Sequence, residues 1–502
     1  MTNNYQLIGL FAAVLAGEIG HLDYSQCSNF VESACARCLD LQSPIEDLDS
    51  EILQFNLVRY SKLQFEDRQN LILKSLRMAK KWLAKGVRVH LCIDEPKLRS
   101  CIHLFKVIFS FGALNILDNP TVMIMNSRPG RKVRSDSPWL VKTASLARYS
   151  MERNWTLVSS YGSIPYFVVS WLAKGHDLIV VCDGALPFMN TQEAEAKFYN
   201  EFSDFFDMGR TLFLSGFTRG GLPKLKDRWI IRDEMVAAIS KIMAPSEIRP
   251  DGIMSRLLQS AHSTDKVVIT DFLKKTGKVV SRNRLGSKTS ANLPQFFVQR
   301  LRDDADGDLL FHYTRACFGP WPGQSWSNYL SDLMSHTAGS AHDALDTLIR
   351  ILTERKIRAN GTWTRGSTPV VSFTENGPTQ LGAIRKWRRG LIRYTFEPYS
   401  IGFSRKVLLE KGIRKVVYGT EQDFTTLRQD SKPFFQLASS SCSDWTPEKE
   451  WRLLGDLDFH GMETSDWFVI VPDHESACKI LRSVIIINLR IYVASFETAN
   501  LV

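Results

Sequence analysis

The 502-residue chain contains only nine cysteines, too few for the disulfide framework of a small secreted domain. One Cys-x-x-Cys pair, Cys35-Ala-Arg-Cys38, has no second pair at metal-binding spacing, so we expect free or buried thiols and no metal site. No apolar run approaches the roughly 18 residues that a membrane helix needs. The apolar segment at residues 7–15 is preceded by no cluster of cations and followed by Glu18, which argues against a signal peptide. We expect a cytoplasmic protein with no membrane partner.

The chain also lacks the commonest catalytic signatures. It has no P-loop, no His-Glu-x-x-His segment and no Gly-x-Ser-x-Gly turn, which argues against NTPases, zinc proteases and α/β-hydrolases. Its apolar content of 44% and charged content of 23% are typical of a soluble globular protein, and its length suits two or three domains. The formal net charge of +10 favours acidic partners such as nucleic acid or phosphorylated ligands.

Apolar segments alternate with helical ones between residues 118 and 187. Strands are expected at 121–125, 155–159 and 177–182, with a helix over 139–151. Alternation at this spacing predicts a parallel sheet with crossover helices. The ligands of such sheets lie outside the carboxyl ends of the strands. Small or polar residues follow all three strands here, which predicts a nucleotide or phosphate site at that edge.

Two clusters of cations belong to the same half of the chain. The first contains Arg128, Arg131, Lys132 and Arg134 with no carboxylate among them, and the second contains Lys224, Lys226, Arg228 and Arg232. If both clusters lie at one edge of the sheet, they form a phosphate-binding surface with a strong dependence on salt. A solvated loop is the alternative.

At these residues the chain resembles the DNA-processing protein DprA and its wider SLOG family. Residues 107–128 are similar to that family's first strand and Gly-Ser-Arg turn, and Leu157-Val-Ser-Ser160 and Ile179-Val-Val-Cys-Asp-Gly184 to its next two strand ends. Residues 212–215 and 227–240 are similar to its later strand and Arg-Asn-Arg helix start. The resemblance covers about residues 50–250 and implies a Rossmann-like fold.

The resemblance also implies that a nucleotide or single-stranded nucleic acid binds this half. The residues expected to bind it are Ser127, Arg128, Arg131, Lys132, Arg134, Ser159, Ser160, Gly184 and Arg232. The chain departs from the family at Asn126 and Ser160, where the family has glycine, and at Asp233-Glu234, which replaces Asn-Arg. Glycines at such turns let a phosphate approach the backbone, so these departures alter the surface that a ligand meets.

The composition changes at residues 277–293 to Gly, Ser, Asn, Lys and Arg, which indicates an exposed basic linker. Ahead of the sheet, the helical period at 68–85 ends at Gly86. We therefore divide the chain into a helical N-terminal region at 1–115, a DprA/SLOG-like Rossmann domain at 116–275, a linker at 276–305 and a C-terminal domain at 306–502.

The C-terminal domain differs in its pattern. Short strand signals recur at 309–314, 369–374, 391–396, 415–418, 450–454, 467–471 and 484–487. One amphipathic helix interrupts them at about 341–352. Many short strands with few helices predict a compact, mainly antiparallel α+β domain.

Three polar motifs lie among these strands: His312-Tyr-Thr314, Ser372-Phe-Thr-Glu375 and Glu448-Lys-Glu450. Residues 311–314, 399–412 and 445–452, the last reading Trp-Thr-Pro-Glu-Lys-Glu-Trp-Arg, resemble the AbiGi-type abortive-infection proteins of bacteria. The order of a His, then a Ser or Tyr, then a late Glu is also similar to that of ADP-ribosyltransferases. The resemblance covers about residues 309–460 and implies an ADP-ribosyltransferase-like domain that uses NAD.

Cleavage of the nicotinamide–ribose bond passes through an oxocarbenium-like state, which a carboxylate beside the ribose stabilises. By analogy, Glu450 is the main catalytic residue and Glu448 positions the acceptor, and both are expected on one face of a strand. The NAD-binding residues are expected to be His312 and Ser372, with Tyr313 or Phe373 stacking on the nicotinamide. The alternative is a structural histidine and a solvated Glu-Lys-Glu turn.

We interpret the chain as a bacterial anti-phage defence protein. Its SLOG-like part would sense a nucleotide or nucleic acid, and its C-terminal part would be an NAD-dependent ADP-ribosyltransferase or NAD glycohydrolase. Two alternatives remain open. One is a DprA-like protein that binds single-stranded DNA and recruits a partner without catalysis, and the other is a non-catalytic interaction protein. A protein target and a homo-oligomer are also open.

Overall fold

The structure is a computed structural model of the chain. It describes residues 3–19, 24–55, 57–127, 133, 135, 137–202, 204–218, 222–262, 266–269, 298–299, 308–317, 319–335, 342–361, 364–365, 367–388, 393–440 and 443–494. The chain folds into two compact units, the first formed mainly by residues 1–281 and the second mainly by residues 282–502. No helix among the described residues is long and apolar enough to cross a membrane.

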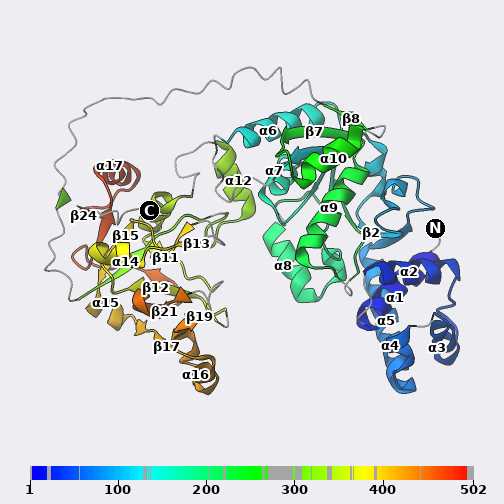
Figure 1. The fold of residues 1–502 in the computed structure, drawn as a ribbon, viewed down its shortest axis with the longest axis horizontal. Helices are drawn as coiled ribbons and strands as arrows, with labels where there is room; N and C mark the ends of the chain where they lie inside the picture. Colours follow the sequence, from blue (N-terminus) through cyan, green and yellow to red (C-terminus); the bar gives the residue numbers. More distant parts are fainter. Residues whose placement is uncertain are drawn as a thin grey trace. The chain divides into compact units, whose positions relative to one another are not determined.

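Helices open the first unit (Figure 1). They are α1 (Asn3–Ile19), α2 (Tyr24–Ala36), α3 (Ile45–Leu53), α4 (Val58–Ser61) and α5 (Phe65–Lys85). Gly86 ends α5 with a left-handed φ of 98°, a conformation that glycine adopts without strain. The Gln6 side chain of α1 donates to the Val89 carbonyl and accepts from its N–H, at 2.9 and 2.7 Å. These two bonds attach the helices to the sheet that follows.

That sheet has eight strands in the order β1-β2-β6-β5-β4-β3-β7-β8. Their bounds are β1 (Arg88–Leu91), β2 (Val107–Phe111), β3 (Thr121–Asn126), β4 (Thr156–Ser160), β5 (Leu178–Val181), β6 (Thr211–Ser215), β7 (Ile242–Glu247) and β8 (Val267–Val268). The pairings from β6 through to β8 are parallel, and β1 and β2 are antiparallel to their neighbours. The predicted parallel sheet is therefore confirmed, with two antiparallel strands added at one edge.

Helices connect the parallel strands. They are α6 (Pro138–Met151), α7 (Ile164–Leu172), α8 (Gln192–Phe202), α9 (Leu225–Ile239) and α10 (Ile253–His262). Buried side chains of α9 and α10, among them Met235, Val236 and Met254, pack on apolar residues of β3 to β6. From β3 the chain adds β4, β5 and β6 on one side, then places β7 on the other side of β3. The connection order thus reverses between β3 and β7.

The second unit is built on another eight-stranded sheet, ordered β16-β21-β12-β10-β15-β23-β24-β9. The strands are β9 (Val298–Gln299), β10 (Leu309–Tyr313), β12 (Val370–Thr374), β15 (Ser400–Ser404), β16 (Arg414–Lys415), β21 (Glu450–Leu454), β23 (Trp467–Val471) and β24 (Ile491–Val493). The pairings from β16 to β23 are antiparallel, and those from β23 to β9 are parallel. The sheet is thus mainly antiparallel.

Two apolar clusters enclose this sheet. The larger contains Leu345 and Leu348 of α13 (Ala344–Glu354) and Ala477 and Ile480 of α17 (His474–Ser483). The smaller contains Phe311 and Tyr313 of β10 with Phe468 and Ile470 of β23. The strand expected at 484–487 is wrong, because the last strand after α17 is β24 and Ile485 is fully exposed. An apolar run predicts a strand only where a neighbouring strand is placed to pair with it.

Candidate functional site

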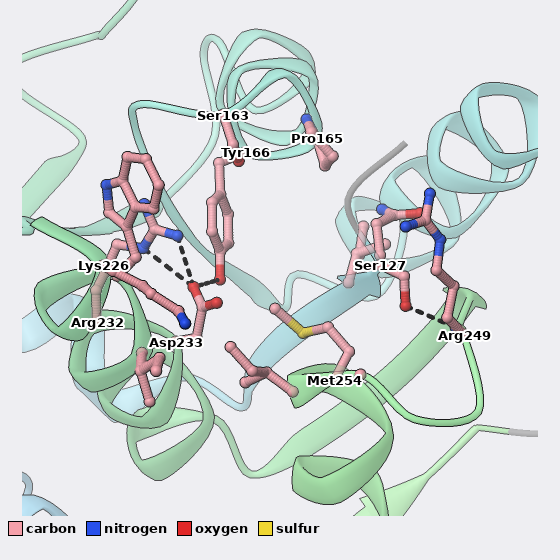
Figure 2. Close-up of a pocket in the computed structure, with 15 residues that line it drawn as sticks. Ser127, Ser163, Pro165, Tyr166, Lys226, Arg232, Asp233, Arg249 and Met254 are labelled. Atoms are coloured by element: carbon pink, nitrogen blue, oxygen red, sulfur yellow. Dashed lines mark hydrogen bonds and ion pairs between the residues drawn. The ribbon is translucent and has the colours of Figure 1, made fainter. Parts of the chain in front are cut away.

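A cavity of about 510 Å³ lies where the strand order reverses (Figure 2). It is lined by the end of β3, the start of α7, one side of α9, the turn after β7 and the start of α10. The lining residues are Ile124, Asn126, Ser127, Ser163, Pro165, Tyr166, Lys226, Trp229, Ile230, Arg232, Asp233, Arg249, Gly252, Ile253 and Met254. Ligands of open parallel sheets bind outside the strand ends at such a reversal, so this is the position expected for a ligand.

Positive charge surrounds the cavity. Lys226 and Arg249 are exposed on its lining, and neither forms an ion pair within the described part of the chain. The first turns of α7 and α10 also reach the cavity and contain no acidic residue. Backbone N–H groups at the start of a helix and the helix dipole both favour an anion there. The combination can hold a phosphate.

A buried polar network forms one wall of the cavity. Arg232, only 3% exposed, donates from Nε and Nη2 to Oδ1 of Asp233 at 3.0 and 2.8 Å. The Tyr166 hydroxyl donates to the same oxygen at 2.8 Å, and Arg232 Nη1 donates to the Tyr161 carbonyl at 3.2 Å. Burial alone would lower the pKa of Arg232, but its neighbours, Asp233 among them, raise it above the ordinary value. Arg232 is therefore a paired cation.

The predicted ligand residues divide into three groups. Ser127 and Arg232 line the cavity, and the Ser127 hydroxyl accepts a hydrogen bond from the Arg249 N–H at 2.6 Å. Ser159, Ser160 and Gly184 do not line it. The remaining four, Arg128, Arg131, Lys132 and Arg134, lie outside the described residues.

The positions of Ser159, Ser160 and Gly184 have a physical reason. Both serines are fully buried, and their hydroxyls donate to the carbonyls of Tyr166 and Val181 at 2.9 and 2.6 Å. Their hydrogen-bonding capacity therefore serves the sheet and α7. The Gly184 carbonyl accepts from the Ser215 hydroxyl at 2.6 Å, which joins the ends of β5 and β6.

Sequence reasoning missed Tyr166, Trp229 and Arg249 as cavity residues. Arg249 follows β7 in the turn that leads to α10, so a cation in a strand-to-helix turn was the signal that could have found it. Tyr166 is in an apolar helix and carries no such signal. Burial and the Asp233 carboxylate together raise its pKa well above the ordinary range, so it is a neutral hydrogen-bond donor at physiological pH.

A second polar cluster belongs to the second unit. Ser372 donates from Oγ to Oε1 of Glu450 at 2.7 Å. Arg452 donates from Nε to the same oxygen at 2.9 Å and from Nη2 to Oε2 at 2.8 Å. The Glu450 N–H donates to the Tyr418 hydroxyl at 2.9 Å. The carboxylate is thus fixed by a serine on β12 and by an arginine two residues along its own strand.

His312 lies on β10, the strand next to β12, but its side chain does not face this cluster. Phe311 pairs with Thr374 and Thr374 with Glu450, so the alternation of side chains places His312 on the other face of the sheet, where its ring centroid lies 5.7 Å from that of Phe373. Its Nδ1 lies 2.9 Å from the Ser372 carbonyl oxygen. A carbonyl oxygen can only accept, which assigns the proton to Nδ1 and leaves Nε2 as an acceptor. Desolvation lowers the pKa of His312 to about 4, so the ring is neutral at pH 7. A hydroxyl group of a ligand could donate to such a nitrogen.

The expectation that Glu448 and Glu450 share one strand face is wrong. Glu448 ends a 3-10 turn, η7 (Thr446–Glu448), and strand β21 begins only at Glu450. Lys449 between them has a left-handed φ of 44°, which breaks the alternation of side chains. The hydroxyl of Thr374 fixes this turn by donating to the Glu448 carbonyl at 2.5 Å.

The two predicted stacking residues are buried. Phe373 is 2% exposed in the larger apolar cluster, and Tyr313 is 5% exposed in the smaller one. The Tyr313 hydroxyl donates to the Asn376 carbonyl at 3.2 Å. Both rings support the sheet, so neither offers a free face to a nicotinamide ring, and the prediction that either stacks on nicotinamide does not fit this structure.

No protein-family model matches the chain, and no curated protein matches it. Solved structures similar to part of it are DNA processing protein A (DprA) proteins. The Streptococcus pneumoniae DprA structure is 14% identical, with a TM-score of 0.33, over 53% of this chain and 86% of that one. A Helicobacter pylori DprA structure, described for its single-stranded DNA binding mode, is 19% identical with a TM-score of 0.25, over 31% of this chain and 69% of that one.

Proposed function

We propose that the first unit recognises a nucleotide and that the ligand lies in the cavity at the β3–β7 reversal. The observation that carries the proposal is a cavity outside the strand ends with two exposed cations on its lining, Lys226 and Arg249, which form no ion pair with any described residue. Its volume is within the roughly 300–1,000 Å³ of small-molecule sites. The phosphates would meet Arg249, Ser127 and the start of α10, and the base would meet the apolar wall.

Isothermal titration of the full chain with ATP, GTP, CTP and UTP tests this proposal. We expect one or more of them to bind, and Lys226→Gln and Arg249→Gln each to weaken binding about tenfold, because each removes a charge-assisted phosphate contact. Lys81→Gln is the matched control, since Lys81 is an exposed residue of α5 outside the cavity. Absence of nucleotide binding, or equal losses in all three variants, contradicts the proposal.

Single-stranded nucleic acid is the second candidate ligand of this unit. Lys224 and Lys226 are exposed at the start of α9, and with Arg249 they place positive charge around the cavity. Phosphate contacts release counterions, so affinity for an oligonucleotide would fall steeply with salt. Lys226→Gln should then reduce the slope of log K against log salt by about one. A salt-independent affinity would exclude this candidate.

We further propose that the second unit uses NAD, as an ADP-ribosyltransferase or NAD glycohydrolase. The supporting observation is the 2.7 Å hydrogen bond between Ser372 and Glu450, which Arg452 reinforces from the same face of the sheet. Breaking the nicotinamide–ribose bond leaves positive charge on the ribose, which the Glu450 carboxylate would stabilise. Ser372 would orient that carboxylate. The predicted contact of His312 with the ribose does not fit this arrangement, because the His312 side chain lies on the other face of the sheet. Glu448 would position the acceptor.

Release of nicotinamide from NAD, measured by mass spectrometry with and without nucleotide, tests this second proposal. Glu450→Gln keeps the shape of the side chain and removes its charge, so we expect at least a hundredfold loss of activity. Glu410→Gln, an exposed position on α15 (Arg405–Glu410), is the matched control. A Glu450→Gln variant as active as the wild type would reject the assignment.

These two activities would make the chain a sensor and effector in bacterial anti-phage defence. The first unit would bind a nucleotide or nucleic-acid signal, and the second would consume NAD or modify a protein target. Survival of phage-challenged bacteria that express the wild type or Glu450→Gln tests this role. Equal protection by both would favour a non-catalytic interaction protein, and protection by neither would argue against defence.

A further inference from the structure

One carboxylate oxygen in the cavity wall is unusual. Asp233 is 7% exposed, and all three of its hydrogen bonds end on Oδ1. Within the described part of the chain no group donates to Oδ2. Figure 2 shows this oxygen turned away from Arg232, toward the open centre of the cavity. The wall therefore presents an unused hydrogen-bond acceptor to whatever fills the cavity.

Oδ2 of Asp233 is not among the fully enclosed polar atoms that lack a partner, so water can reach it in the open cavity. A carboxylate oxygen has two lone pairs, and leaving it unpaired inside a filled cavity is unfavourable. A ligand that displaces water from the cavity must therefore bring an O–H or N–H donor to Oδ2. A ligand without that donor leaves the oxygen unpaired and binds more weakly.

The charges around Asp233 indicate what net charge a ligand of the cavity should have. Its negative charge is balanced by the 2.8 Å ion pair with Arg232, so the pair presents little net repulsion to an anion. Lys226 and Arg249 are the other two charged residues of the lining, and both are cations. The cavity suits a molecule that is anionic in one part and offers hydroxyl donors in another. A phosphorylated ribonucleoside has both properties.

We propose that Asp233 selects ribonucleotides over 2′-deoxyribonucleotides, by accepting a hydrogen bond from a ribose hydroxyl at Oδ2. This inference rests on the proposed nucleotide recognition and specifies its ligand class. Acidic side chains accept from ribose hydroxyls in other Rossmann-like sites, so the pairing is chemically sound. Arg232 and Tyr166 act as positioning residues here, because they hold Oδ1 and leave Oδ2 facing the cavity.

Isothermal titration of the full chain with the four ribonucleoside triphosphates and their 2′-deoxy counterparts tests the inference. For a ribonucleotide that binds, we expect the wild type to prefer it about tenfold or more over its 2′-deoxy form. Asp233→Asn should reduce that ratio toward one. Lys81→Gln is the control, since Lys81 is an exposed residue of α5 outside the cavity, so its ratio should match that of the wild type.

The ratio of ribonucleotide to 2′-deoxyribonucleotide affinity also distinguishes a failure of the Asp233 role from a failure of nucleotide recognition itself. Both sugars meet the same folded protein, so general destabilisation cancels in the ratio. Binding of nucleotides with no preference for ribose, or a preference that survives in Asp233→Asn, overturns the role of Asp233 and leaves nucleotide recognition standing. Failure of all eight nucleotides to bind overturns both. If Asp233→Asn does not fold, a wild-type ratio near one still overturns the inference.

Discussion

Replacing Arg452 by methionine tests how the second unit holds its candidate catalytic carboxylate. Arg452 is buried, and besides Glu450 it donates to the carbonyls of Pro433 and Phe435 and to Oε1 of Gln436, each at 2.9 Å. Methionine fills much of the same space and donates nothing. The substitution would leave Glu450, whose side chain is 15% exposed, without its counter-charge.

Removing one partner of a buried ion pair costs about 3–5 kcal/mol, because the remaining charge stays desolvated. We expect Arg452→Met to lower the free energy of unfolding of the second unit by that amount. The double variant Arg452→Met with Glu450→Gln removes both charges and should lose less than the sum of the single variants. The difference, about 1–3 kcal/mol, is the coupling energy of the pair.

Urea denaturation followed by tryptophan fluorescence measures these free energies. Arg428→Met is the matched control, because Arg428 is 86% exposed and its ion pair with Asp430 is long, at 3.5 Å. An exposed pair of this kind contributes about 1 kcal/mol or less. Two results would contradict this reasoning: an Arg452→Met variant no more destabilised than Arg428→Met, or single and double variants that show no coupling energy. Either would mean that Arg452 does not stabilise the Glu450 carboxylate.

Three further outcomes follow from the same structure. Burial lowers the pKa of His312 from 6.5 to about 4, so between those values the unfolded chain binds the proton first and stability falls as the pH falls. The second unit should lose up to about 2 kcal/mol between pH 7 and pH 5 through this residue, and His312→Gln should flatten the urea midpoints across that range. Gly402→Ala should destabilise the same unit by about 1–3 kcal/mol, since its Cβ would lie 2.6 Å from the Phe468 ring; an unchanged midpoint would show that the ring can move aside. Asp49→Asn should loosen the N-terminal helices by about 1–3 kcal/mol, because Asp49 is buried and pairs with Arg68 at 2.9 Å; thermal unfolding at the wild-type temperature would contradict this.

The main strands of the first unit could be predicted because buried parallel strands are continuous apolar segments. The segments at 121–125, 155–159 and 177–182 correspond to β3, β4 and β5 with small shifts at their ends. Two-residue strands such as β16 are too short to show a periodic pattern in the sequence, and they form because a neighbouring strand pairs with them. The apolar residues at 484–487 illustrate the converse, since no strand of the described residues pairs with them.

The sequence could predict a site residue only where its place next to a strand end or along a strand determines its role. Ser127 follows β3 directly, so the sequence placed it at the carboxyl edge. Tyr166 and Asp233 are 67 residues apart and meet only through the packing of α7 and α9, which no local pattern encodes. The pairing of Arg452 with Glu450 could have been predicted, because a residue two positions after Glu450 on a strand lies on the same face.

Hydrogen–deuterium exchange of the full chain, with and without the tightest-binding nucleotide, tests most directly whether the β3–β7 reversal is the binding site. A bound phosphate would accept hydrogen bonds from N–H groups at the starts of α7 and α10. We expect slower exchange at residues 163, 164, 166 and 252–254, and unchanged exchange in the helices at residues 45–85. Slower exchange that leaves both helix starts unaffected would contradict the account.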